Sequence, residues 1–290
     1  MPFRTLCVTS RCKLEYSLNY LVCRGEEERR IHLSEVSALI IQSTGVALTA
    51  SLLSELMDRK ITVIFCDSKA NPQAELLPFY GTATSSLRIR EQARWDLSLA
   101  DEAWKQITRA KIENQAGILK KYQCDQGASM LLSYAEQVLP GDTTNREGHA
   151  AKVYFNDLFG NGFTRSDESL TNAFLNYGYS ILLSSMNREI VSFGYLTQLG
   201  IHHKNEFNDF NLGCDLMEPL RPIVDDYAKS GKLTEENFKR ELNKLLNLSV
   251  VSEGKQMYLD NAIHLFVQSF FSFMREGEIR KLAFLERYEL

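Results

Sequence analysis

Short runs of apolar and β-branched residues, separated by turn-forming or charged residues, characterise residues 1–81. This pattern is typical of β-strands. The predicted strands are Thr5–Thr9, Lys13–Tyr16, Tyr20–Arg24, Arg30–Leu33, Ala38–Ile41, Ile61–Cys66 and Glu75–Leu77. A single helix is expected among them, with Thr49 as its N-cap and Leu52 and Leu56 on its apolar side. We therefore predict a small β-rich domain over residues 1–81.

Beyond residue 86 the apolar residues recur at helical spacing. The intervening segment 82–86 is small and polar, as is typical of a linker. Predicted helices begin at Asp101 and Glu147 and cover Met130–Val138, Asn172–Phe193, Asp215–Tyr227, Thr234–Leu246 and Asp260–Met274. The predicted fold class is α+β: a small N-terminal β-rich domain with one short helix is followed by a large all-helical C-terminal domain over residues 87–290.

Glu147 is out of place in this pattern. Ala150, Tyr154 and Leu158 follow it at offsets of three, seven and eleven residues, so all lie on one apolar stripe of the predicted helix. A carboxylate that faces a core costs several kcal/mol unless an amide, a cation or a metal ion satisfies it. Thr144 and Glu147 also fit a capping box, which would be a purely structural role. Both interpretations stay open from this stretch alone.

Two further stretches carry candidate chemistry. His202 and His203 are adjacent in a predicted loop, and imidazole is a common ligand of transition metals. Asp215 and Glu218 are three residues apart, so a helix would project both carboxylates from one face. Arg221 is three residues further on and offers Glu218 a structural ion pair instead.

Composition narrows the class of protein. The formal net charge is −4, which is mild evidence against a dedicated DNA-binding protein, although a local basic face stays compatible with it. Six scattered cysteines without a CxxC pair argue against a zinc site or a disulfide framework. Neither a signal peptide nor a membrane span is expected, and a reducing cytoplasm is the predicted location.

Together, the acidic residues and the loop histidine suggest a divalent ion. A Glu, His, Glu set suits Mg²⁺ or Mn²⁺, and the histidine favours manganese. Such ions serve phosphoryl-transfer enzymes, because they orient the attacking oxygen and neutralise charge on the phosphate.

Three blocks of residues carry a family resemblance. They are Asn145-Arg146-Glu147-Gly148-His149-Ala150-Ala151 with Tyr154-Phe155, Gly200-x-x-His203-x-Asn205, and Asp215-Leu216-Met217-Glu218-Pro219-x-Arg221-Pro222. In order and spacing they resemble the CRISPR spacer-acquisition integrase, the large subunit of the adaptation complex. The likeness covers nearly the full length and is greatest to the type II-A branch.

This resemblance implies a function and an assembly. Family members join the 3′-hydroxyl ends of a short double-stranded DNA fragment, the spacer precursor, to a repeat array by transesterification. They form a homodimer through the N-terminal β domain, and two dimers flank a dimer of a small companion subunit, which makes a heterohexamer. On the matching motifs, Glu147, His203 and Glu218 are the catalytic metal ligands, and Asp215 is a second-tier candidate.

Basic residues offer candidate DNA contacts. Arg88 follows the linker, Arg146 precedes Glu147, and Lys105, Arg109 and Lys111 lie on the first long predicted helix. Arg88 and Arg146 are the two residues that we propose for DNA binding. Two other functions remain open at this point: a metal-dependent nuclease that uses water instead of the 3′-hydroxyl, and a non-catalytic structural subunit of a DNA complex.

Overall fold

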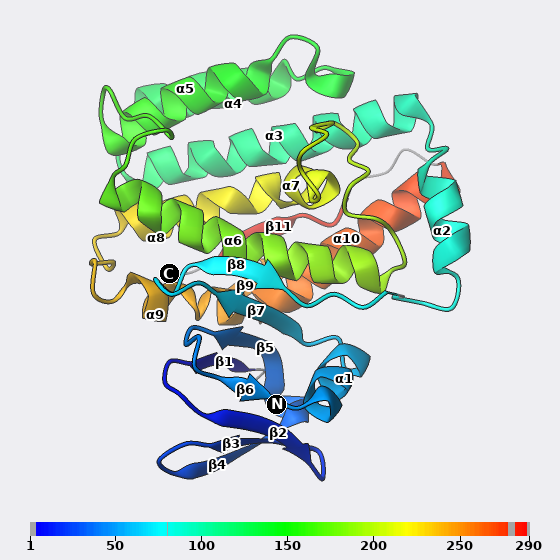
Figure 1. Ribbon diagram of the computed structural model, residues 1–290. Helices are drawn as coiled ribbons and strands as arrows, with labels where there is room; N and C mark the ends of the chain where they lie inside the picture. Colours follow the sequence, from blue (N-terminus) through cyan, green and yellow to red (C-terminus); the bar gives the residue numbers. More distant parts are fainter. Residues whose placement is uncertain (1–3, 80, 278–281, 289–290) are drawn as a thin grey trace.

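The protein is described here by a computed structural model that covers residues 4–79, 81–277 and 282–288. A β-rich part lies below a larger helical part in Figure 1. The strands of the lower part and of the interface are β1 (Arg4–Val8), β2 (Lys13–Ser17), β3 (Tyr20–Arg24), β4 (Glu28–His32), β5 (Val36–Ile41), β6 (Ala47–Leu48), β7 (Thr62–Cys66) and β8 (Pro72–Glu75). Helix α1 (Ala50–Asp58) begins where predicted, because the Thr49 side chain accepts a hydrogen bond from the Leu52 N–H.

Two four-stranded sheets build the β-rich part. One has the order β1-β5-β7-β8, and the other has the order β4-β3-β2-β6. Strand β5 is buried on both faces: Leu39 and Ile41 pack between the sheets, whereas Ala38 and Ile40 join the core of the helical part. Since successive side chains of a strand point to opposite faces, one apolar run contributes to two cores.

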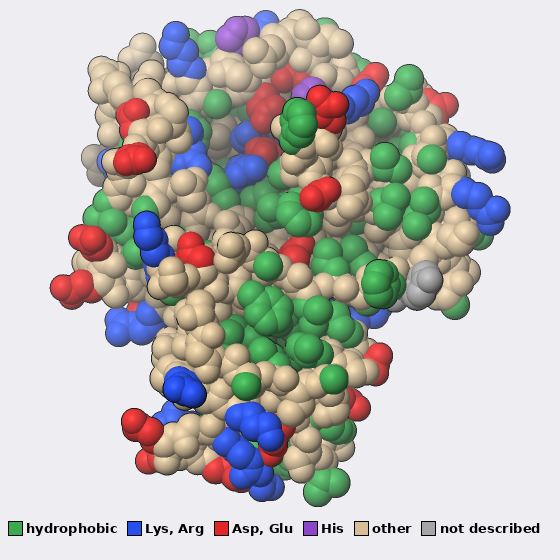
Figure 2. Space-filling model, viewed as in Figure 1, with side chains coloured by type: hydrophobic (Ala, Val, Ile, Leu, Met, Phe, Trp, Pro, Cys, Tyr) green, Lys and Arg blue, Asp and Glu red, His purple; other side chains and the backbone are tan. Residues whose placement is uncertain are grey.

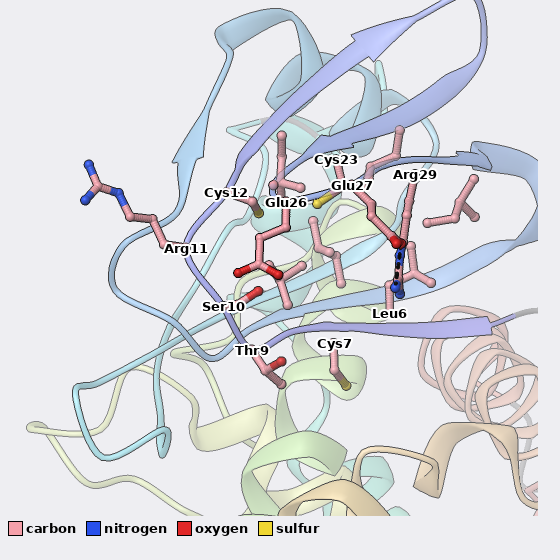
Figure 3. Close-up of a pocket in the computed structure, with 16 residues that line it drawn as sticks. Leu6, Cys7, Thr9, Ser10, Arg11, Cys12, Cys23, Glu26, Glu27 and Arg29 are labelled. Carbon is pink, nitrogen blue, oxygen red and sulfur yellow. Dashed lines mark hydrogen bonds and ion pairs between the residues drawn. The ribbon is translucent and has the colours of Figure 1, made fainter.

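A cavity of about 670 Å³ opens between the two sheets (Figure 3). Its apolar floor includes Leu14 and Leu39, and its polar lining includes Glu27 and Arg29, which form an ion pair of 3.4 Å. Cys12, directly before β2, and Cys23 of β3 also line it.

Helices form most of the upper part. They are α2 (Ser85–Gln92), α3 (Leu97–Lys121), α4 (Asp125–Glu136), α5 (Arg146–Phe159), α6 (Leu170–Ser192), α7 (Asn211–Met217), α8 (Arg221–Lys229), α9 (Phe238–Leu242) and α10 (Leu259–Glu276), with 3₁₀ turns at Leu33–Glu35, Pro140–Asp142, Glu218–Leu220 and Leu245–Asn247. Helix α6 is buried on most of its surface and contacts α7, α8, α9, α10 and the sheet strands β7 and β8. It therefore ties the β-rich part to the helices that carry the candidate site.

The prediction of an all-helical C-terminal domain is wrong. Strands β9 (Ser249–Ser252), β10 (Lys255–Tyr258) and β11 (Leu285–Tyr288) form a sheet of order β10-β9-β11. Glu253 and Gly254 have φ values of 50° and 69°, so they form a two-residue hairpin turn between β9 and β10. The sequence does contain a signal for this hairpin, namely the β-branched residues Val250 and Val251 shortly before the Glu-Gly pair. The helical periodicity of the neighbouring segments led us to overlook it.

Other boundaries shift by a few residues. Helix α3 begins at Leu97 rather than Asp101, because the Asp96 side chain accepts a hydrogen bond from the Ser98 N–H and caps it. Helix α2 begins at Ser85, inside the segment 82–86 that we predicted as a linker. The domain division 1–81 and 87–290 stays a prediction. Among the helices that the structure describes, none combines the length and the hydropathy needed to cross a bilayer.

Candidate metal centre and active site

The carboxylate of Glu147 takes no part in capping the start of α5. Asp142 accepts hydrogen bonds from the Arg146 N–H (2.8 Å) and the Glu147 N–H (2.9 Å), and the N-cap Asn145 accepts one from the Gly148 N–H (3.2 Å). Two acceptors therefore satisfy the amides that are left open at a helix start. Thr144 is not the N-cap, and the predicted capping box is wrong. The Glu147 side chain is thus available for another partner.

Replacement of Asp142 by Asn should destabilise this helix start. The amide retains one acceptor oxygen, so one of the two N–H groups loses its partner, at a cost of about 1–2 kcal/mol. Urea unfolding of D142N measures this loss. Thr144→Ala is the matched control, because it changes the predicted cap that forms no cap bond, and its stability should equal that of the wild type. Equal stability of D142N and T144A would contradict the capping role of Asp142.

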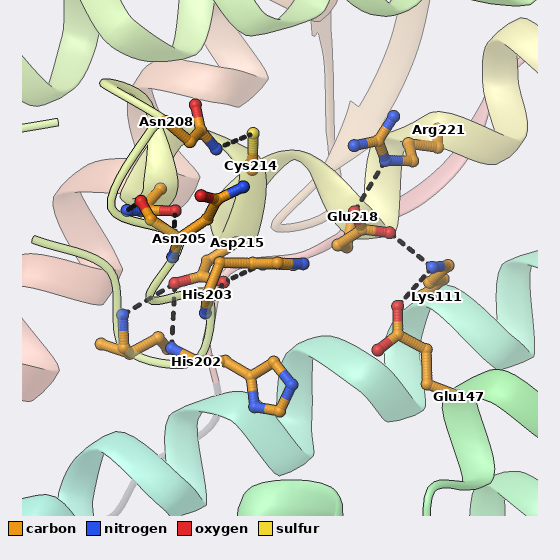
Figure 4. A network of polar contacts seen from close by, with 12 residues as sticks. Lys111, Glu147, His202, His203, Asn205, Asn208, Cys214, Asp215, Glu218 and Arg221 are labelled. Carbon is orange, nitrogen blue, oxygen red and sulfur yellow. Dashed lines mark hydrogen bonds and ion pairs between the residues drawn. The ribbon is translucent and has the colours of Figure 1, made fainter. Parts of the chain in front are cut away.

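A buried lysine joins Glu147 to Glu218. The Lys111 Nζ atom lies 2.6 Å from Oε1 of Glu147 and 2.5 Å from Oε2 of Glu218 (Figure 4). The three residues come from α3, α5 and the 3₁₀ turn between α7 and α8. The predicted ion pair of Glu218 with Arg221 is also confirmed, with Nε of Arg221 2.7 Å from Oε1. Glu218, 4% exposed, therefore has a cation on each side.

These contacts keep Glu218 and Lys111 charged. Burial alone would raise the pKa of Glu218, but Lys111 and Arg221 outweigh it and hold the pKa at about 2. Burial would lower the pKa of Lys111, yet Glu218 and Glu147 reverse this effect and raise it. At neutral pH Glu218 is thus an anion between two cations, Lys111 and Arg221.

Asp215 organises the loop that carries His203. Its fully buried carboxylate accepts hydrogen bonds from the N–H groups of Ile201 (2.7 Å), His202 (3.0 Å) and His203 (3.0 Å). It also accepts a fourth from Nδ1 of His203 at 2.5 Å. In this contact Nδ1 donates to the carboxylate oxygen, so the neutral ring has its lone pair on Nε2. The hydrogen bond to Asp215 also raises the pKa of His203, although burial opposes this.

The prediction that the Asp215 and Glu218 carboxylates project together from one helix face is wrong, because they contact different partners. Helix α7 ends at Met217, and the chain continues in a 3₁₀ turn. Asp215 therefore turns to the loop, whereas Glu218 turns to Lys111 and Arg221.

Trp104 of α3 supports the two histidines from below. The exposed His202 ring stacks on it, with ring centroids 4.1 Å apart and planes 5° apart, and His203 meets its edge at 5.8 Å. The indole is 1% exposed, so it is a fixed platform. His202, which falls outside the family motif, thus helps to hold the loop against α3.

Figure 4 shows the predicted metal ligands in one region of the helical part, with the His203 ring extending toward Glu218 and Lys111. Figure 2 shows a hollow on the same part of the molecule, around which acidic, basic and histidine side chains gather. Within the described ranges, no three His, Cys, Asp or Glu side chains stand close enough to hold one ion in this conformation, and Lys111 lies between the carboxylates.

The donor set nevertheless fits a divalent cation. Among the described residues, Oε2 of Glu218 has no hydrogen-bond donor of suitable geometry, and its ion-pair partner is Lys111. Glu147 and Glu218 already share one cationic group, and Nε2 of His203 is an open nitrogen donor. Oxygen ligands with one imidazole suit Mg²⁺ or Mn²⁺.

Lys111 is the site residue that sequence reasoning missed. The sequence placed it on a basic helical face, either solvated or in contact with DNA, but its side chain is only 12% exposed. The signal was present, because Trp104, Thr108 and Gln115 lie on the same buried stripe of α3 at offsets of three or four residues. A lysine on such a stripe needs a buried anion, by the same argument that singled out Glu147.

The predicted DNA-binding arginines are not tested by these contacts. Arg146 lies over the Tyr134 ring, 5.6 Å from its centroid, and its Nε is buried without a hydrogen bond. Arg88 on α2 pairs with Glu91 at 2.9 Å.

Known proteins with similar sequences are nucleic-acid enzymes. The CRISPR-associated endonuclease Cas1 of Neisseria meningitidis serogroup C is 32% identical over 294 residues, which cover 99% of this chain and 97% of the relative. Residues 6–262 match the family described as CRISPR associated protein Cas1. The chain belongs to the Cas1 family. The predicted family is thus confirmed, and so is the predicted enzyme class, a DNA endonuclease/integrase of CRISPR adaptation; the type II-A branch stays a prediction.

Solved structures share the fold. A casposase bound to integration product matches with a TM-score of 0.76 and 19% identity, covering 97% of this chain and 92% of the other. A partial Cas6-RT-Cas1–Cas2 complex matches with a TM-score of 0.64 and 18% identity, covering 96% and 97%. At these identities the likeness concerns the fold alone.

Proposed function

We propose that this chain joins the 3′-hydroxyl ends of a short double-stranded DNA fragment to a repeat array by metal-dependent transesterification. The observation that carries the proposal is the meeting of Glu147 and Glu218, 71 residues apart in sequence, on one cationic group beside the His203 ring. The casposase with the same fold, which is bound to integration product, supports joining rather than simple hydrolysis.

Glu147, His203 and Glu218 would hold one Mg²⁺ or Mn²⁺ ion. When bound, the ion neutralises charge that develops on the phosphodiester and orients the attacking oxygen. Asp215 fixes the His203 ring so that Nε2 faces the carboxylates. Arg221 keeps Glu218 ionised and limits its rotation. The protein side chains thus preorganise an acidic site for an anionic substrate.

The binding of DNA and of a partner is part of the same proposal. Arg146 and Arg88 are candidate phosphate contacts, because an acidic centre needs cations around it to hold a phosphate backbone. The Cas1–Cas2 complex with the same fold supports a small companion subunit of the Cas2 kind. We further propose a homodimer through residues 1–81, a heterohexamer with the companion subunit, and a cytoplasmic location, which the six free cysteines favour.

A labelled joining assay tests this function. The chain and its companion subunit receive a fragment with a labelled strand, a supercoiled repeat plasmid and Mn²⁺. We expect the label to become covalently attached to nicked plasmid, and excess EDTA to abolish this product. A heat-denatured gel distinguishes covalent joining from binding.

The alternative outcomes correspond to the other functions. Nicked plasmid without attached label would favour hydrolysis by water and overturn the integrase proposal. Joining at an undiminished rate in EDTA would overturn the metal dependence.

A further inference from the structure

Lys111 occupies the position between the carboxylates where a bridging cation would lie. We propose that its ammonium group is a built-in counter-cation, which holds Glu147 and Glu218 together until a divalent ion displaces it toward Gln115 and Asp225. This inference rests on the proposed metal site and adds a positioning residue to it.

The ammonium and a divalent ion compete for the same oxygens. Within the described residues, only Lys111 forms a hydrogen bond or an ion pair with the Glu147 carboxylate. It is also the ion-pair partner of Oε2 of Glu218, whereas Arg221 pairs with Oε1. Mg²⁺ binds carboxylate oxygen at about 2.1 Å. The Nζ atom already lies 2.5–2.6 Å from the same two oxygens. A metal ion bound to both oxygens would overlap with the ammonium group and repel its positive charge, so the two cannot occupy this position together. Metal loading therefore requires Lys111 to move.

A cavity next to the site offers space for this movement. It measures about 210 Å³, and its lining includes Lys111, Gln115, Glu218, Arg221 and Asp225. Gln115 follows Lys111 by one helical turn on α3, so the two side chains are neighbours on one face. The flexible lysine side chain can therefore turn within its own helix face without any change of backbone.

Two acceptors in this cavity form no ion pair or hydrogen bond with a cation of the described part of the chain. Oε1 of Gln115, which is 2% exposed, finds no hydrogen-bond donor among the described residues. Asp225 is 1% exposed; it accepts hydrogen bonds from the hydroxyl groups of Tyr154 and Tyr179, and it forms no ion pair with any described residue. An ammonium group that left the carboxylate pair would find a neutral acceptor and an anion there. Because a buried acceptor without a donor is costly, the movement satisfies groups that the present arrangement leaves open.

Calorimetric titration of Mn²⁺ into the full chain, without DNA, tests the displacement. Lys111→Met removes the competing ammonium, so we expect its Mn²⁺ dissociation constant to fall about tenfold or more below that of the wild type. Without Mn²⁺, the Tm of K111M should lie below the wild-type Tm, because no cation then separates the two carboxylates. Addition of Mn²⁺ should raise the Tm of K111M by more than it raises the wild-type Tm. Lys121→Met is the matched control on the same helix, since Lys121 pairs with Asp226 instead; its Mn²⁺ affinity should equal that of the wild type.

Gln115→Leu tests the destination of the ammonium group. It should weaken Mn²⁺ binding about threefold or more when Lys111 is present, and leave it unchanged in the K111M background. Equal effects in both backgrounds would overturn the destination. If K111M folds only with Mn²⁺, chelator competition on the Mn²⁺-purified protein supplies the same dissociation constant.

The outcomes also separate this inference from the proposed metal site. Unchanged or weaker Mn²⁺ binding by K111M, with normal binding by the wild type, overturns the role of Lys111 alone. Failure of the wild type and of K111M alike to bind Mn²⁺ overturns the metal site itself, and with it the displacement.

Discussion

Replacement of Glu147 by Gln is expected to lower the rate of fragment joining about a hundredfold or more while the protein stays folded. Loss of a residue that only orients a metal ligand typically lowers metal affinity or activity by about 10–100-fold. Loss of a charged ligand should cost at least the upper end of that range. The covalently labelled product of the joining assay, followed over time with Mn²⁺, measures the effect.

Folding of the E147Q variant should be nearly unaffected, because Asp142 and Asn145, not Glu147, cap α5. Glutamine can still accept a hydrogen bond from Lys111, so the contact with α3 is weakened and not abolished. Glu113→Gln is the matched control: Glu113 lies on α3 and pairs with the exposed Arg109, and its loss should not change joining. Full activity of E147Q would remove Glu147 from the mechanism.

Local sequence patterns predicted which helices and strands form better than they predicted the residues at which these elements begin and end. The strands β1, β2, β3, β5 and β7 and the helices α1, α5, α6 and α10 lie within a few residues of their predicted positions. Apolar periodicity is a local property that tertiary packing reinforces, so it survives in the sequence. The short sheet of β9, β10 and β11 does not, because β11 comes from a segment far along the chain and pairs with β9 through non-local contacts.

The site shows the same division between local and long-range information. Glu147 was identifiable because a charge on an apolar helix stripe needs a partner. Its partner Lys111 obeyed the same rule on α3, but no sequence pattern shows that the two stripes face each other. The stacking of His202 on Trp104 likewise depends on how distant segments approach. The capping by Asp142 is local instead, because Asp142 precedes the two amides by four and five residues. Motif spacing predicts the proposed ligands, whereas the contacts around them follow only from packing.

Replacement of Asp215 by Asn is expected to destabilise the protein by about 2–4 kcal/mol. The buried carboxylate accepts four hydrogen bonds, and in asparagine an NH₂ donor replaces one of its two acceptor oxygens. If the amide NH₂ faces Ile201 and His202, their N–H groups lose their acceptor. If it faces His203 instead, Nδ1 must become the acceptor, and the ring proton moves to Nε2. The second arrangement removes the lone pair that we assign to the metal, so Mn²⁺ affinity should fall about 10–100-fold.

Urea unfolding and Mn²⁺ titration of D215N measure both effects, with Asp209→Asn as the control in the same segment. Asp209 is exposed, so its variant should stay within about 0.5 kcal/mol of the wild type. The two measurements test different links, because lost loop bonds lower stability whereas a wrong histidine tautomer lowers metal affinity. Wild-type stability of D215N would contradict the role of Asp215 in holding the loop. Wild-type Mn²⁺ affinity despite lost stability would show that the His203 ring is oriented by Trp104 and not by the carboxylate.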